Sequence, residues 1–138
     1  MAPNESGPRC AVLAVVIAEN SVLLVRRCKA PDAGLWGFPG GQVAFGEPLT
    51  DAATRELHEE TSLTAQPLGV IDALDVLPAD ANAHYVLIGV AMTAPVGTAR
   101  PSSDASEAAW FDHDGLPADR SAGVARVLSA ATARFCFS

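Results

Sequence analysis

Runs of apolar residues separated by polar breaks predict the first elements of the chain. Residues 11–18 form an uninterrupted apolar run, and a second run at 22–26 follows after three polar residues. Apolar runs of this length are typical of buried strands. The short break, with Asn20 in the turn, predicts a hairpin between the two strands. Residues 29–41 hold several Gly and Pro, so we expect a shaped loop there with one short strand.

The clearest helical segment is at residues 49–61, which contain no Gly or Pro and are rich in Ala, Leu, Arg and Glu. Pro48 suits a first helical position, and Asp51 in the first turn favours the helix dipole. The remaining pattern predicts an extended segment at 66–77, a strand at 83–93, a loop at 101–107, a short strand at 108–111 and a closing helix at 124–135. This alternation indicates an α/β or α+β fold with a mixed sheet.

Length and composition fit one folded domain. The chain has 138 residues, of which 49% are hydrophobic, enough for one buried core without disulfides. We therefore expect a single domain over residues 1–138, with about residues 1–9 as a flexible N-terminus. The net charge of −7 argues against binding to nucleic acid or to an anionic membrane, since both need a basic face.

Cysteine usage and the N-terminal residues predict a cytoplasmic location. The three cysteines are odd in number and show no C-x-x-C spacing, so neither a disulfide framework nor a zinc knuckle is indicated. The first nine residues lack the basic start and apolar stretch of a signal peptide. The apolar run at 11–18 is too short to span a bilayer.

Carboxylates on the predicted helix share a face with its apolar residues. At about 100° per residue, Glu56 and Glu60 lie close to the direction of the apolar stripe, and Glu59 about 80° away; the stripe consists of Leu49, Ala52, Ala53 and Leu57. A solvated charged helix is the ordinary interpretation of such acids. Burying them unpaired would cost several kcal/mol each or force protonation. Arg55 can satisfy only Glu59 at i, i+4, whereas Mg²⁺ or Mn²⁺ could be bound by all three acids.

These acids belong to a longer motif. From Gly41 the sequence reads GQVAFGEPLTDAATRELHEETSL, which resembles the Nudix box, G-x5-E-x7-R-E-U-x-E-E-x-G-U, where U is a bulky aliphatic residue. The positions in register are Gly41, Glu47, Arg55, Glu56, Leu57, Glu59, Glu60 and Leu63. Ser62 departs from the motif, because the family has Gly there. That position is expected to be a left-handed turn ending the helix, at a cost of about 1 kcal/mol for Ser.

Segments outside the motif resemble the ADP-ribose pyrophosphatase-like branch of the Nudix hydrolases. They are LWGFPGG before the box, and HYVLIGVAM and SSDASEAAWF after it. The resemblance implies the Nudix fold, an α/β/α sandwich with a central mixed β-sheet.

The resemblance also implies a metal site and its catalytic residues. Glu56, Glu59 and Glu60 would bind Mg²⁺ (or Mn²⁺), with one of them as base, and Gly40 would add its carbonyl. Arg55 would orient Glu59 or a neighbouring acid. A further carboxylate is expected from a loop outside the box, with Asp104 as first candidate and Glu107 as second.

Four residues are candidates for the substrate side of the site. Arg26 and Arg27 end a strand, and alternation would bring one of them to a phosphate or ribose. Trp36, like Phe38, could stack on a base, although core packing is the alternative. Glu47 would support the helix or bind a metal through water.

The resemblance implies hydrolysis of a nucleoside diphosphate linked to another moiety, with ADP-ribose favoured. A sanitising (8-oxo-)dNTP pyrophosphohydrolase is the alternative. A non-catalytic nucleotide-sensing module would be expected to lose box carboxylates, and all are present. The expected partners are a small-molecule nucleotide and a second copy in a homodimer, with no nucleic acid and no membrane.

Overall fold

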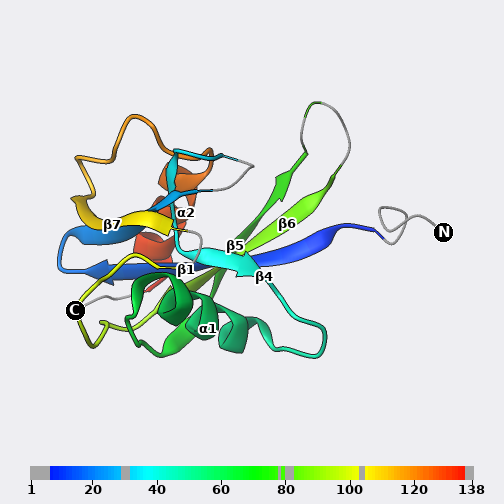
Figure 1. The fold of residues 1–138 in the computed structure, drawn as a ribbon, viewed down its shortest axis with the longest axis horizontal. Coiled ribbons are helices and arrows are strands. Elements are labelled where there is room, and N and C mark those ends of the chain that lie inside the picture. The colour runs from blue at the N-terminus through cyan, green and yellow to red at the C-terminus, as the bar shows by residue number, and fades with distance from the viewer. Residues whose placement is uncertain (1–6, 29–31, 78, 80–82, 103–104, 136–138) are drawn as a thin grey trace.

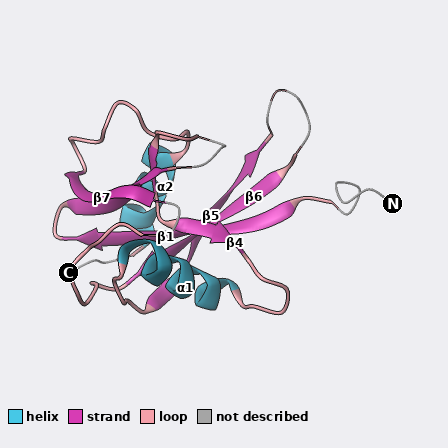
Figure 2. Cartoon of the chain, viewed as in Figure 1, coloured by secondary structure: helices cyan, strands magenta, loops and turns pink. Residues whose placement is uncertain are grey.

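The computed structural model describes residues 7–28, 32–77, 79, 83–102 and 105–135. The chain folds into strands that cross the middle of the molecule, with helices packed against them (Figure 1; Figure 2). In chain order the elements are β1 (Arg9–Ala18), β2 (Ser21–Arg27), β3 (Trp36–Gly37), β4 (Gly40–Gln42), α1 (Leu49–Thr61), β5 (Pro67–Val76), β6 (Tyr85–Met92), β7 (Ala105–Asp112) and α2 (Val124–Arg134).

Strand β1 organises the sheet, whose main path is β3-β2-β1-β6-β5. It runs parallel to β6, from Arg9 opposite Tyr85 to Val16 opposite Met92. It runs antiparallel to β4 at one end and to β2 at the other. Beyond these pairs, β5 lies antiparallel to β6, and β7 and β3 lie antiparallel to β2. The predicted mixed sheet is confirmed.

The apolar run of β1 is continuous because helices cover both faces of the strand. Val12, Ala14 and Val16 pack with the buried residues of α1. Val15 and Ile17 point the other way and pack with the buried residues of α2. Successive side chains of a strand point to opposite faces, so one apolar run serves both layers. The expected α/β/α sandwich is confirmed.

Helix α1 has the predicted bounds, but Pro48 precedes the first helical residue as an extended N-cap. Ser62 ends the helix with φ 66° and ψ 5°, which confirms the expected left-handed turn. Helix α2 ends at Arg134, one residue before the predicted end. Within the described ranges, no helix is long and apolar enough to cross a membrane.

The hairpin forms as predicted, and the loops differ from the prediction in detail. Asn20 lies in the turn between the paired residues Ala18 and Ser21, and Glu19 beside it takes the left-handed conformation, with φ 57°. The Gly-rich loop carries two short strands, β3 and β4, where one was expected. Strand β7 begins at Ala105, inside the predicted loop, because its polar start pairs with Arg26 and Arg27 of β2. Polar residues can form a strand where the partner strand supplies the hydrogen bonds.

Candidate active site

The acids of α1 differ in burial. Glu60 is a buried residue with 7% of its surface exposed, and the Glu56 side chain is 12% exposed. The Glu59 side chain is 47% exposed, and His58 points to solvent. The expectation that acids share the core-facing side of the helix is therefore confirmed for Glu56 and Glu60, while Glu59 lies at its solvent edge.

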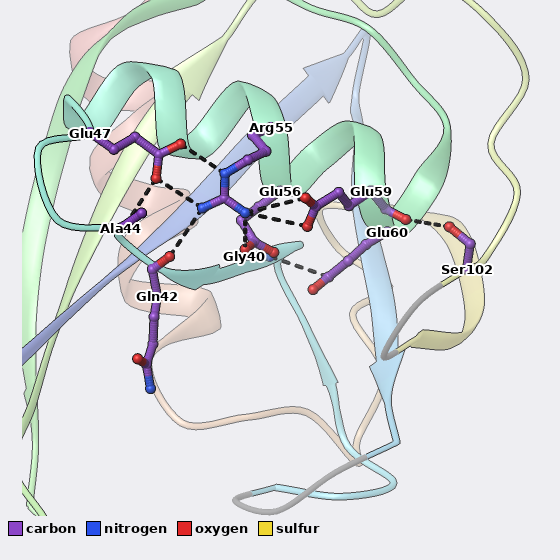
Figure 3. A network of polar contacts seen from close by, with 9 residues as sticks. All are labelled: Gly40, Gln42, Ala44, Glu47, Arg55, Glu56, Glu59, Glu60 and Ser102. Carbon is purple, nitrogen blue, oxygen red and sulfur yellow. Dashed lines mark hydrogen bonds and ion pairs between the residues drawn. The ribbon is translucent and has the colours of Figure 1, made fainter.

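Arg55 lies at the centre of a polar cluster that joins the helix to the preceding loop (Figure 3). Its Nε and Nη2 donate to the two carboxylate oxygens of Glu47 at 2.8 and 2.9 Å. Its Nη1 donates to Glu56 Oε1 at 2.8 Å and reaches the Glu59 carboxylate at 3.3 Å. Nη2 also donates to the carbonyl of Gln42 at 3.2 Å. The planar guanidinium can hold several acceptors at once in a fixed geometry.

Glu47 is ionised well below neutral pH. The hydrogen bonds from Arg55, supported by the Ala44 N–H at 3.0 Å, hold the pKa of its carboxyl at about 2, against an ordinary 4.5. The same pairing with Glu47 raises the pKa of Arg55 above its ordinary value. Glu47 is thus tied to Arg55 and to the loop before α1, in keeping with its expected support of the helix.

Two glycines allow the sheet to approach the carboxylates closely. The Gly40 N–H donates to Glu60 Oε1 at 3.3 Å. A Cβ on Gly41 would lie 2.6 Å from the carboxylate of Glu56, and one on Gly40 would lie 2.0 Å from the carbonyl oxygen of Val12. Any side chain at these positions would displace the acids or the strand.

A cavity of about 250 Å³ lies beside the same glycines. Gly40, Gly41 and Gln42 form part of its wall, and the rest includes apolar residues of β5 and β6 and the segment before α2. Arg27 and Phe38 also line it. A concave, mostly apolar space with a few polar groups is typical of a small-molecule site.

The two adjacent arginines have different surroundings. Arg26 forms ion pairs with Glu107 and with Asp119, both at 3.1 Å, and its guanidinium lies 5.0 Å from the ring centre of Trp36. Trp36 is 7% exposed and packs edge-on against Phe111, with ring centres 4.9 Å apart. Among the described residues, Arg27 lines the cavity and Arg26 and Trp36 do not. A substrate contact by any of the three stays a prediction.

The candidates for a further carboxylate lie after the Nudix-like motif. Asp104 is outside the described residues. Glu107 is exposed on β7 and pairs with Arg26. Sequence reasoning missed Ser102, whose N–H donates to the Glu60 carbonyl at 3.1 Å and whose hydroxyl donates to the Glu59 carbonyl. No local pattern could have indicated this contact, because the partners are 43 residues apart.

The donor set of the cluster fits a hard divalent cation. Within the parts of the chain that are described, no three His, Cys, Asp or Glu side chains stand together as a formed metal cage. The cluster nevertheless gathers the carboxylates of Glu47, Glu56 and Glu59 around one guanidinium, and the Glu60 carboxylate lies nearby on the Gly40 N–H (Figure 3). Its ionised form therefore carries excess negative charge on oxygen donors, which Mg²⁺ and Mn²⁺ prefer. Gly41, which the Glu56 carboxylate approaches closely, also lines the cavity.

Known proteins resemble this chain over most of its length. An ADP-ribose pyrophosphatase of Methanocaldococcus jannaschii is 31% identical over 110 residues, which cover 80% of this chain and 65% of that protein. The mouse 8-oxo-dGDP phosphatase NUDT18 is 27% identical over 130 residues, covering 91% of this chain and 39% of that protein. The chain thus spans less than two thirds of the length of both relatives.

A solved structure and a family model identify the fold. The crystal structure of a MutT NUDIX hydrolase from Burkholderia pseudomallei superposes with a TM-score of 0.84 at 28% identity, covering 91% of this chain and 98% of that one. The NUDIX domain model matches residues 7–131, which include all of the carboxylates around Arg55. On this match and on the shared fold, the chain belongs to the NUDIX domain family of hydrolases.

Proposed function

We propose that this Nudix hydrolase cleaves the pyrophosphate bond of a nucleoside diphosphate linked to another moiety, with ADP-ribose as the favoured substrate. The observation that carries the proposal is that the same two glycines border both the cavity and the carboxylates. Gly40 and Gly41 line the cavity and also contact Glu60 and Glu56. A substrate held in the cavity would therefore have its phosphates beside the acids. The 31% identical relative, an ADP-ribose pyrophosphatase, supports the choice of substrate.

Glu56, Glu59, Glu60 and the Gly40 carbonyl would hold Mg²⁺ or Mn²⁺. When bound, such a cation withdraws charge from the pyrophosphate oxygens and makes water a better nucleophile at neutral pH. Asp104 is proposed as the further carboxylate, with Glu107 second.

The side chains of the protein would position the metal ligands and take a proton from the attacking water. Arg55 holds the carboxylates of Glu56 and Glu59 through one nitrogen, Nη1, so the two acids keep a fixed spacing. Glu47 in turn fixes the Arg55 fork. One of the three helix acids would accept a proton from the attacking water. Arg27 on the cavity wall would contact a phosphate or the terminal ribose.

The reaction conserves all atoms. The oxygen of one water molecule bonds to a phosphorus of the pyrophosphate, and the bond from that phosphorus to the bridging oxygen breaks. The bridging oxygen leaves on the other phosphate, and the proton of the water passes through the carboxylate to solvent. From ADP-ribose the products are AMP and ribose 5-phosphate.

The test is hydrolysis of ADP-ribose with and without Mg²⁺, by wild type and by Glu60→Gln. The amide keeps the shape of Glu60 and an acceptor for the Gly40 N–H, but it removes the negative charge. We expect turnover that needs the cation and falls about 100-fold or more in E60Q, a loss of roughly 2.7 kcal/mol of transition-state stabilisation. Glu19→Gln, the same change in the exposed β1–β2 turn, is the matched control and should retain wild-type turnover. Turnover that E60Q leaves unchanged would refute the assigned role.

An oxidised purine nucleotide is the second candidate substrate, supported by the likeness to the mouse 8-oxo-dGDP phosphatase. The ratio of kcat/KM for ADP-ribose, 8-oxo-dGDP and 8-oxo-dGTP separates the two proposals. Absence of turnover across this panel with Mg²⁺ would favour a non-catalytic nucleotide-sensing module instead.

The other expectations from the sequence also stay proposals. They are a single domain over residues 1–138, a homodimer and a cytoplasmic location. Light scattering of the purified chain tests the homodimer.

A further inference from the structure

The last turn of α1 carries two of the proposed metal ligands, and its carbonyls need partners from outside the helix. An α-helix leaves its last four C=O groups without an intrahelical donor. Here the Ser62 N–H at the left-handed turn takes only the carbonyl of His58, at 2.9 Å. The carbonyls of Glu59, Glu60 and Thr61 are left to other segments.

A segment about forty residues further along the chain supplies all three missing donors. The Arg100 N–H donates to the Thr61 carbonyl at 2.8 Å, and the Ser102 N–H donates to the Glu60 carbonyl at 3.1 Å. The Ser102 hydroxyl donates to the Glu59 carbonyl. Figure 3 shows Ser102 at this end of the helix, beyond Glu59 and away from Arg55. The helix end is therefore capped by tertiary contacts.

Two of the three capped residues, Glu59 and Glu60, have carboxylates that lie in the cluster. The Glu59 carboxylate accepts from Arg55 Nη1 at 3.3 Å, and the Glu60 carboxylate accepts from the Gly40 N–H at 3.3 Å. Glu59 and Glu60 are thus each held at the backbone by Ser102. At the side chain, Glu59 is held by Arg55 of the same helix and Glu60 by Gly40 of β4. Fixing both ends of a ligand residue restricts the positions that its oxygens can take.

We propose that Ser102 is a positioning residue, whose hydroxyl orders the last turn of α1 so that Glu59 and Glu60 are preorganised for a divalent cation. This inference rests on the proposed function, in which these acids bind Mg²⁺ or Mn²⁺. Ser102 is exposed and acts only through the backbone of the helix. Its removal should therefore weaken cation binding without unfolding the protein.

The test is Mn²⁺ binding to the full chain without substrate, measured by calorimetry or by electron paramagnetic resonance. Ser102→Ala removes the hydroxyl and keeps the N–H bond to Glu60. We expect the Kd for Mn²⁺ to rise about three- to tenfold, as for the loss of one hydrogen bond. Ser102→Thr keeps a hydroxyl donor and should stay within about twofold of wild type.

Thr132→Ala is the matched control. It removes a similar exposed hydroxyl bond, from Thr132 to the Ser129 carbonyl at 3.1 Å, on the other helix. Its Kd for Mn²⁺ should equal that of wild type, even where its thermal midpoint falls as far as that of S102A. Far-ultraviolet circular dichroism verifies that each variant is folded. Where S102A does not fold, the Kd of S102T for Mn²⁺ still tests the proposal, because weakened binding with the hydroxyl retained would contradict it.

The outcomes separate the inference from the proposed function. If wild type and S102A bind Mn²⁺ equally well, the inference about Ser102 is overturned and the proposed function is not. Equal weakening in S102A and T132A also overturns it, because the effect would then be one of general stability. Wild type that takes up no Mn²⁺ overturns both.

Discussion

At the scale of single residues, Arg55 decides how the carboxylates are arranged. It contacts three acids and one carbonyl through three nitrogens. A lysine at this position would supply one nitrogen on a flexible stem and could not reproduce the fork. The pairing expected from sequence, Arg55 with Glu59, is present, but the shorter contacts are with Glu47 and Glu56.

The low pKa of Glu47 predicts a specific pH dependence of stability. The carboxyl has a pKa of about 2 in the folded protein and 4.5 ordinarily, so the unfolded chain binds its proton first as the pH falls. The stabilisation from Glu47 is therefore complete above about pH 4.5 and is lost as the pH falls towards 2. In Glu47→Gln this contribution is absent at every pH. Urea unfolding of both proteins between pH 7 and pH 2 measures the difference.

The free energies of unfolding of wild type and E47Q should converge as the pH is lowered through this window. Circular dichroism at pH 7 verifies that E47Q is folded. Parallel profiles, separated by a constant gap from pH 7 to pH 2, would show that Glu47 does not carry this proton linkage.

At the scale of elements, α1 has bounds set by local chemistry and an end secured by distant contacts. Pro48 and Ser62 delimit the helix. Proline suits the residue before the first turn, whereas Ser62 ends the helix in a left-handed conformation that is strained for a residue with a Cβ. The carbonyls beyond the reach of Ser62 are bound by the segment at residues 100–102. The helix that carries the acids is thus fixed at its C-terminus by two different means.

The left-handed Ser62 predicts a stabilising substitution. With φ 66° and ψ 5°, Ser62→Gly should raise the free energy of unfolding by about 0.5–1 kcal/mol, because relief of the strained conformation exceeds the added entropy of the unfolded chain. Urea unfolding at pH 7 measures the change. Ser62→Ala, which keeps a Cβ, should give no gain. A loss of stability in S62G would contradict the strain at this turn.

At the scale of the whole molecule, two apolar clusters lie on opposite faces of one sheet. The α1 cluster contains Leu57 and the α2 cluster contains Trp36, both buried. Strand β1 contributes to both clusters through its alternate side chains. Loss of packing in one layer should therefore destabilise the other as well.

Leu57→Ala tests this coupling. The Leu57 side chain has 0% exposure, so its truncation should cost about 2–5 kcal/mol of unfolding free energy. Unfolding is followed by tryptophan fluorescence, which includes Trp36 in the other layer, and by circular dichroism. The unfolding transitions seen by the two probes should shift together. Leu77→Ala, at a leucine that is 67% exposed, should change stability by less than about 0.5 kcal/mol. Separate transitions for the two probes would contradict one cooperative unit.

The features that the sequence by itself determined are those with local causes. The bounds of α1 and the hairpin after β1 follow from composition and periodicity within a few residues, and the left-handed turn at Ser62 is expected from its position in the motif. The carboxylates of Glu56 and Glu60 on the core-facing side of α1 follow from helical spacing alone. The motif from Gly41 to Leu63 indicated the family for the same reason, because all of its residues lie in one continuous segment.

The tertiary structure decided everything that depends on strand pairing and on contacts between distant segments. Alternation predicted that Arg26 and Arg27 would differ, but only the pairing of β2 with β7 directs Arg26 to Glu107 and leaves Arg27 on the cavity wall. The start of β7 and the role of Ser102 depend likewise on partners far along the chain. Such contacts arise from packing geometry, which a local sequence pattern does not encode.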